Sequence, residues 1–132
     1  MGVAARILVV EDNELIRAEV ATILSLEGFE VVEAENGRDG LRRLAEERPD
    51  LILSDLMMPE MDGFAFLEAA RANALWASIP FVMLSARGDK DAAEQALALG
   101  ARRYLTKPVD VEALLAIVAH ALGGDASTPQ RG

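Results

Sequence analysis

Charged and hydroxyl side chains follow several short apolar runs of this chain. Such runs, rich in Val, Ile, Leu and Phe, are typical of strands that are buried on both faces of a parallel sheet. Because the carboxyl ends of parallel strands meet at one edge of the sheet, residues at those ends are the first candidates for chemistry. They are three acids, one hydroxyl and one amine: Glu11, Asp12, Asp55, Ser85 and Lys107.

This set of groups suits a divalent cation and a phosphoryl group. Three carboxylates in one place repel each other, and a hard cation with oxygen ligands is the usual way to keep them ionised. Mg²⁺, with Mn²⁺ as an alternative, fits better than Ca²⁺, because the sequence has no D-x-D-x-D-G loop. A lysine and a hydroxyl beside the cation suit phosphoryl transfer, in which an aspartate can itself be the nucleophile.

The elements that position these residues alternate as strand and helix. We expect helices at residues 63–72 and 92–99, a helix capped by Asn36 and a last helix capped by Asp110. This order predicts an α/β fold: a (βα)5 doubly wound, five-stranded parallel sheet with helices on both faces and right-handed crossovers. The expected strands are Ile7–Val10, Phe29–Val32, Leu51–Leu53, Phe81–Leu84 and Arg103–Thr106.

Length and composition narrow the class of protein. The chain has 132 residues, which suits one domain, and its net charge of −9 argues against a nucleic-acid surface. Cysteine is absent, which excludes disulfides, zinc–cysteine sites and thiol nucleophiles. Neither a membrane helix nor a signal peptide is visible, so we expect a cytoplasmic protein. We expect residues 1–122 to form the domain, and 123–132, rich in glycine and small polar residues, to be a flexible tail or the start of a linker.

Four motifs of the chain resemble the receiver domain of bacterial two-component response regulators. They are ILVVEDN from residue 7, SDLMMPEMDG from residue 54, LSA from residue 84 and YLTKPV from residue 104. Their order and spacing match the family, and the resemblance covers residues 5–122. It implies a flavodoxin-like strand order 2-1-3-4-5, which sets the ends of the first and third strands side by side.

The resemblance implies a role for each acid. Asp55 would be the phosphoacceptor. Asp12 and Asp55 would bind Mg²⁺ directly, Glu11 would act mainly through water, and the backbone carbonyl of Met57 would be a further ligand.

The same resemblance implies roles at the other strand ends. Ser85 would hydrogen-bond a phosphoryl oxygen, and Lys107 would pair with the phosphoryl group. The peptide bond before Pro108 would be cis. Tyr104 would swing inward when Ser85 moves to the phosphate. Met57 and Arg87, two residues after Asp55 and Ser85, would tune dephosphorylation, and neither side chain activates water, so we expect slow self-dephosphorylation.

The implied function is a phosphorylation switch that does not turn over an external substrate. A sensor histidine kinase or phosphotransfer protein would donate the phosphoryl group to Asp55. The switch would then alter the surface formed by the last two helices and the last strand. That surface would contact a downstream protein, an output domain missing from this chain, or a second copy in a phosphorylation-dependent dimer. We expect no contact with nucleic acid or membrane.

Three other functions compete with this interpretation. A pseudo-receiver that signals by binding alone usually lacks one or more of the five site residues. A phosphatase with an aspartate nucleophile usually has a second aspartate two positions later, where this chain has Met57. A flavodoxin would have a hydroxyl-rich phosphate loop after the first strand instead of acids.

Several residues have simpler interpretations. Ser85 could cap a helix, and Glu11 with Asp12 could be a solvated helix start. Trp76 is either a packing residue or a partner contact. The Arg102–Arg103 pair either changes partner choice or is solvated, and His120 lies off the apolar face of its helix, where we expect it to be exposed.

Overall fold

The computed structural model describes residues 4–123, in which strands and helices alternate as predicted. All but the first residue of the predicted tail, 123–132, lies outside the described residues. The strands are β1 (Arg6–Val10), β2 (Glu30–Ala34), β3 (Leu51–Asp55), β4 (Phe81–Ser85) and β5 (Arg103–Thr106). The helices are α1 (Glu14–Leu26), α2 (Gly37–Glu47), α3 (Gly63–Ala72), α4 (Lys90–Ala98) and α5 (Val111–Ala121).

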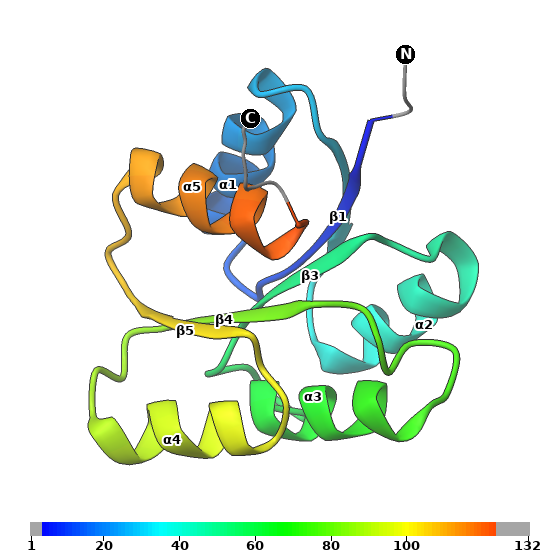
Figure 1. The fold of residues 1–132 in the computed structure, drawn as a ribbon, viewed down its shortest axis with the longest axis vertical. Coiled ribbons are helices and arrows are strands. Elements are labelled where there is room, and N and C mark those ends of the chain that lie inside the picture. Colours follow the sequence, from blue (N-terminus) through cyan, green and yellow to red (C-terminus); the bar gives the residue numbers. More distant parts are fainter. Residues whose placement is uncertain (1–3, 124–132) are drawn as a thin grey trace.

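The strands form one parallel sheet in the order β2-β1-β3-β4-β5, which confirms the predicted fold. Figure 1 shows α1 and α5 on one face of the sheet and α2, α3 and α4 on the other. The strand order reverses between β1 and β3, so their carboxyl ends are neighbours. Open parallel sheets bind ligands at such a reversal.

Two apolar cores, one on each face of the sheet, hold the helices. Strands β3 and β4 are buried along their whole length, and alternate side chains enter opposite cores. Ile52 and Phe81 belong to the core beneath α2, α3 and α4, where Phe81 lies against Phe66 with ring centroids 5.5 Å apart. Leu53 belongs to the core beneath α1 and α5, together with Leu24.

Some strand boundaries differ from the prediction. The predicted second strand, 29–32, is wrong at both ends, because β2 pairs with β1 from Glu30 to Ala34. This edge strand exposes Glu30 and Glu33, so its apolar pattern is too weak to mark its ends. Strands β3 and β4 continue beyond their apolar runs, since pairing with neighbouring strands extends to Asp55 and Ser85. These two site residues therefore end their strands instead of following them.

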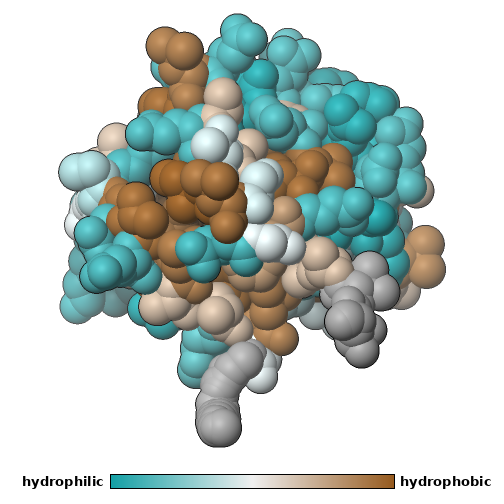
Figure 2. Space-filling view, turned by 90° about the horizontal axis from the view of Figure 1, so that it is seen from above, coloured by the Kyte–Doolittle hydropathy of each residue, from teal (hydrophilic) through white to brown (hydrophobic). Residues whose placement is uncertain are grey.

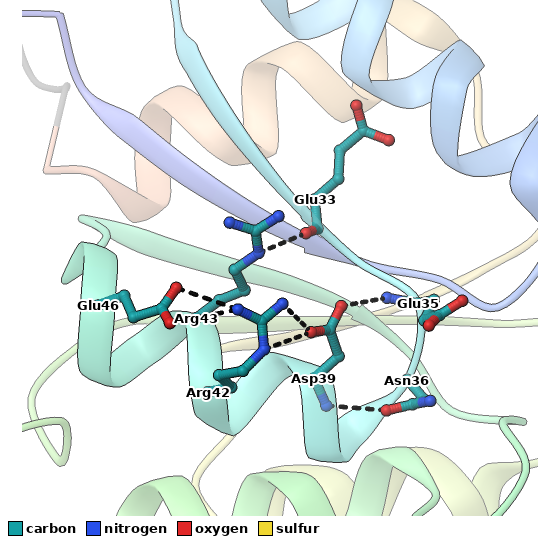
Figure 3. Close-up of polar contacts among 7 residues, drawn as sticks. All are labelled: Glu33, Glu35, Asn36, Asp39, Arg42, Arg43 and Glu46. Atoms are coloured by element: carbon teal, nitrogen blue, oxygen red, sulfur yellow. Dashed lines mark hydrogen bonds and ion pairs between the residues drawn. The ribbon is translucent and has the colours of Figure 1, made fainter.

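Side-chain caps begin the helices. Asn36 accepts the N–H of Asp39 at the start of α2, as predicted, and Asp39 in turn accepts the N–H of Glu35 and pairs with Arg42 (Figure 3). Burial alone would raise the pKa of Asp39, but these hydrogen bonds and the arginine charge lower it below its ordinary value. No helix within residues 4–123 has the length and apolar character needed to cross a membrane.

The structure places the residues with simpler interpretations. Trp76 is half-buried and packs against the core beneath α2, α3 and α4, which favours a packing role. Arg102 donates to the carbonyl of Ala121 at the end of α5, at 3.5 Å. Arg103 is exposed on β5, and His120 is exposed as predicted.

Candidate functional site

The structure brings three carboxylates together at the carboxyl edge of the sheet. Glu11, Asp12 and Asp55 each offer an oxygen, and these oxygens lie within 4.8 Å of one another. Glu11 is 5% and Asp55 is 7% exposed, whereas Asp12 is exposed. The cluster thus has two buried members and one that is open to solvent.

The register of the central strands creates this cluster. Val10 of β1 lies opposite Ser54 of β3, so the next residues, Glu11 and Asp55, are neighbours at the edge of the sheet. Because β1 and β3 pair in parallel where the strand order of the sheet reverses, residues far apart in the chain meet at this edge.

In the β1–α1 loop, Asn13 caps α1, and the two acids before it do not. Asn13 is the N-cap of α1 and accepts the N–H of Ile16 at 3.0 Å, so neither acid caps the helix, and Glu11 is buried rather than solvated. The N–H of Asn13 donates to Oε2 of Glu11 at 3.0 Å. The Glu11 backbone N–H donates to the carbonyl of Ala34 at 3.1 Å, which anchors the loop to β2.

Lys107 supplies the ammonium group of the site. Its Nζ donates to Oε1 of Glu11 at 2.8 Å and lies 3.3 Å from Oδ1 of Asp55. Burial by itself lowers the pKa of Lys107, but the hydrogen bond to Glu11 and the charge of Asp55 outweigh it, so the pKa is raised above its ordinary value. The ammonium therefore stays charged at neutral pH and offsets part of the acidic charge. The peptide bond between Lys107 and Pro108 is cis.

The backbone around Asp55 holds its carboxylate in place. Oδ1 of Asp55 accepts the N–H of Leu56 at 2.9 Å, and the carbonyl of Asp55 accepts the hydroxyl of Ser54 at 2.9 Å. Gly63, at the start of α3, donates its N–H to the carbonyl of Leu56 at 2.8 Å. A Cβ at position 63 would lie 2.6 Å from the carbonyl oxygen of Asp55, so only glycine fits there.

Ser85 is fully buried at the end of β4 and does not cap a helix, because Asp89 is the N-cap of α4. The carbonyl of Ser85 accepts the N–H of Lys107 at 2.8 Å, which joins two site residues through the sheet. Its Oγ accepts the N–H of Arg87 at 3.0 Å. The hydroxyl proton of Ser85 then remains free to donate to a ligand.

Of the residues expected to matter for switching and lifetime, Arg87 lies in the β4–α4 loop, Tyr104 lies against it, and Met57 follows β3. The hydroxyl of Tyr104 donates to the carbonyl of Arg87, and its half-buried ring packs against the core. The guanidinium of Arg87 donates to both carboxylate oxygens of Asp89, each at 3.0 Å. Met57 is 56% exposed, unlike Met58, which is buried.

Sequence reasoning missed one residue of the site. Arg17 of α1 donates from Nη1 to the backbone carbonyl of Glu11 at 2.7 Å. The only signal in the sequence is a cation that follows two acids closely, and that pattern is common on solvated helices.

An apolar groove adjoins the site. It has a volume of about 440 Å³ and is lined by residues of α1 and α5 together with Lys107 and Leu84. Figure 2 views the face that carries these two helices and shows apolar side chains gathered on it.

The donor set fits a hard divalent cation. All the candidate ligand atoms are carboxylate oxygens, which Mg²⁺ prefers, and the exposed Asp12 leaves room for the water molecules that Mg²⁺ retains. A cation beside Lys107 would also suit a phosphoryl group. Fold and site together define a flavodoxin-like module with an acidic, cation-compatible edge.

Comparison with known proteins agrees with this description. The family model described as the response regulator receiver domain matches residues 7–119. The phosphate regulon transcriptional regulatory protein PhoB of Klebsiella pneumoniae is 42% identical over 113 residues, which cover 86% of this chain and 49% of PhoB. Protein PilH of Pseudomonas aeruginosa is 35% identical over 120 residues, which cover 91% of this chain and 99% of PilH. The structure of the Vibrio cholerae chemotaxis protein CheY4 superposes with a TM-score of 0.85 at 34% identity, covering 89% of this chain and 98% of that one.

The chain therefore belongs to the response regulator receiver domain family. Receiver domains of this family are signalling modules and not enzymes that turn over a substrate, and they bind Mg²⁺ at an acidic pocket. The chain spans about half the length of PhoB and almost the whole of PilH.

Proposed function

We propose that this receiver domain accepts a phosphoryl group on Asp55 from the phosphohistidine of a sensor histidine kinase or phosphotransfer protein. The observation that supports this most directly is the position of Asp55, whose carboxylate lies close to a lysine and to two further acids at one edge of the sheet. All five residues that the chemistry needs are present, which argues against a pseudo-receiver that signals by binding alone.

In the transfer, an oxygen of Asp55 attacks phosphorus in line with the P–N bond of the phosphohistidine. The new O–P bond forms as the P–N bond breaks, and the electron pair of the broken bond returns to the imidazole. Leu56 N–H holds the attacking carboxylate in place, which reduces the entropic cost of reaction. Lys107, whose Nζ lies 3.3 Å from Asp55, would stabilise the negative charge of the phosphoryl group.

Glu11, Asp12 and Asp55 would hold Mg²⁺, or alternatively Mn²⁺, with the backbone carbonyl of Met57 as a further ligand. When bound, the cation supplies the charge neutralisation that lets several carboxylates and a phosphoryl group share one site. Both carboxylate oxygens of Glu11 already accept protein hydrogen bonds, so Glu11 would act on the cation mainly through water.

Ser85 and Tyr104 would report the phosphorylated state to the surface. If Ser85 moves to donate its hydroxyl proton to a phosphoryl oxygen, the N–H of Arg87 that its Oγ accepts would follow it, and Tyr104 holds the carbonyl of that same residue. The β4–α4 loop would therefore shift together with Tyr104 and change the surface of α4, β5 and α5. A downstream protein, an output domain or a second phosphorylated copy would bind there.

We infer that the phosphorylated state decays slowly. Met57 has an apolar side chain, and the guanidinium of Arg87 is engaged by Asp89, so neither residue activates a water molecule against the acyl phosphate. A half-life of seconds for the isolated phosphoprotein would contradict this inference.

The proposed function is tested by phosphorylation with acetyl phosphate or phosphoramidate in the presence of Mg²⁺, read as intact mass. Wild type should gain one phosphoryl group, whereas Asp55→Asn should fold and gain none. Asp91→Asn, which removes an exposed carboxylate in the first turn of α4, is the matched control and should be labelled like wild type.

Two results would contradict the assignment. Label that persists on Asp55→Asn would place the acceptor elsewhere. Absence of label on wild type, both with these donors and with a phosphorylated kinase, would favour the pseudo-receiver. Chelation of the divalent cation should abolish labelling of wild type with either acetyl phosphate or phosphoramidate.

A further inference from the structure

Arg17 of α1 reaches back across the β1–α1 loop to the acidic cluster. Its Nη1 donates to the carbonyl oxygen of Glu11 at 2.7 Å. That oxygen belongs to the peptide group that links Glu11 to Asp12. The guanidinium therefore holds the backbone between two candidate cation ligands, and in this contact it does not consume a ligand oxygen.

Glu33 of β2 holds Arg17 in turn. Nε of Arg17 lies 3.2 Å from Oε1 of Glu33, and the Arg17 side chain is 16% exposed. Figure 3 shows the carboxylate of Glu33 pointing away from α2, while its backbone carbonyl accepts a hydrogen bond from Arg43 of α2. Because the guanidinium is planar, binding both Glu33 and the carbonyl of Glu11 restricts the orientation of Arg17.

Every polar group of Glu11 has a partner. Its N–H donates to Ala34, its carbonyl accepts from Arg17, and its two carboxylate oxygens accept from Lys107 and from the N–H of Asn13. Two of these partners are backbone groups, and Lys107 belongs to the site itself. Within residues 4–123, Arg17 is therefore the one side chain outside the acids and Lys107 that donates a hydrogen bond to Glu11.

We propose that Arg17, oriented by Glu33, is a positioning residue that sets the affinity of the acidic cluster for a divalent cation. This inference rests on the proposed cation site of Glu11, Asp12 and Asp55. Asp12 follows the held peptide directly and is the exposed member of the cluster, so rotation of that peptide moves its carboxylate. Partners that orient ligands in this way typically change metal affinity by about 10–100-fold.

The charge of Arg17 alone predicts the opposite effect. A guanidinium near three carboxylates repels a divalent cation, so its removal would tighten binding if charge were all that mattered. Arg17→Gln removes both the charge and the planar donor group, whereas Arg17→Lys keeps the charge and loses the planar donor group. Positioning predicts weaker binding in both variants. Charge alone predicts tighter binding in the first and no change in the second.

The test is calorimetric titration of the full chain with Mg²⁺ alone. We expect the Mg²⁺ dissociation constant to rise about tenfold in Arg17→Gln and Arg17→Lys, and to rise less in Glu33→Gln, which keeps the bond to Glu11. Arg48→Gln is the matched control, since Arg48 also donates to a backbone carbonyl, that of Leu75 at 3.3 Å, and it lies between the end of α2 and the start of β3, at the opposite edge of the sheet from the acidic cluster. Its Mg²⁺ affinity should equal that of wild type.

The outcomes separate this inference from the proposed function. A wild type without Mg²⁺ affinity would refute the proposed cation site and the inference with it. Wild-type binding with unchanged or tighter binding in Arg17→Gln would refute the inference alone. Equal weakening in Arg48→Gln would show a general loosening of the fold and would also refute it. Urea denaturation shows which variants fold. If Arg17→Gln does not fold, Arg17→Lys and Glu33→Gln still test the inference.

Discussion

Gly63 lies directly against the backbone of Asp55. A Cβ at position 63 would be 2.6 Å from the carbonyl oxygen of Asp55 and 2.8 Å from Cα of Leu56. Both are rigid backbone atoms at the end of a buried strand, so neither can turn aside as a flexible side chain would. The start of α3 thus packs against the backbone of the candidate phosphoacceptor.

Replacing Gly63 with Ala should both destabilise the fold and slow phosphorylation. We expect a loss of about 1–3 kcal/mol in the free energy of unfolding, because the extra methyl group must displace backbone. A shift of Asp55 also misaligns the nucleophile, so acetyl phosphate should label the variant more slowly.

Gly28→Ala is the control for this substitution. Gly28 has a φ of +94° and open space around its Cβ position, so the variant should lose about 1 kcal/mol through backbone strain. It lies at the opposite end of α1 from the site, and its labelling rate should equal that of wild type. Wild-type stability and labelling of Gly63→Ala would contradict the close contact.

Lys107→Met should destabilise the cation-free protein by about 1–3 kcal/mol near neutral pH, because Glu11 and Asp55 lose their countercharge. The folded-state pKa of Lys107 is raised, so its contribution is complete below the ordinary lysine pKa of about 10.4 and is lost as pH rises through the higher folded value. The difference between variant and wild type in urea denaturation should therefore shrink at high pH.

Lys90→Met provides the comparison for Lys107. The Lys90 side chain is 85% exposed and lies 3.8 Å from Glu94, so its removal should leave stability unchanged at every pH. A Lys107→Met deficit that stays constant as pH rises past the ordinary lysine pKa would contradict the raised pKa.

Glu60→Gly should stabilise the fold. Glu60 has a φ of 67°, in a tight turn where the N–H of Met61 donates to the carbonyl of Pro59 at 2.7 Å. Non-glycine residues pay about 1–2 kcal/mol for this left-handed conformation, so relief should raise the free energy of unfolding by up to about 1 kcal/mol after the extra entropy of glycine is subtracted. Urea denaturation measures the change. Glu60→Ala keeps the Cβ and loses only the exposed pair with Arg38, and a gain equal to that of glycine there would exclude backbone strain as the cause.

Arg71→Met should loosen the loop that carries Trp76. Nη2 of Arg71 donates to the carbonyl of Gly100 at 3.0 Å, and Nη1 donates to that of Trp76 at 3.5 Å. Arg71 is half-buried, and this burial, followed by the charge of Arg102, lowers its pKa. We expect a loss of about 1–3 kcal/mol and a shift of Trp76 fluorescence to longer wavelength. Arg42→Met, an exposed change on α2, should leave the fluorescence unaltered.

Residue pattern predicted the elements well where burial is uniform. The apolar runs at residues 7–10 and 81–84 predict strands covered on both faces, and only a parallel sheet with helices on each side buries them. The edge strand Glu30–Ala34 was predicted with wrong ends, because half-exposed residues carry a weaker apolar pattern. The ends of β3 and β4 depend on pairing with neighbouring strands, which a local pattern does not contain.

By itself, the sequence determined the alternation of elements, the residue types at the strand ends and the resemblance to receiver domains, since periodicity and motif spacing are local properties of a chain. How those residues meet depends on contacts that form only in the folded chain. Lys107 and Glu11 are 96 positions apart yet share a hydrogen bond of 2.8 Å, the backbone of Asp55 requires a glycine at position 63, and Arg17 holds the peptide between two acids. These contacts depend on strand register and on the packing of α1 and α3 against the sheet, and such long-range geometry is set by the whole fold.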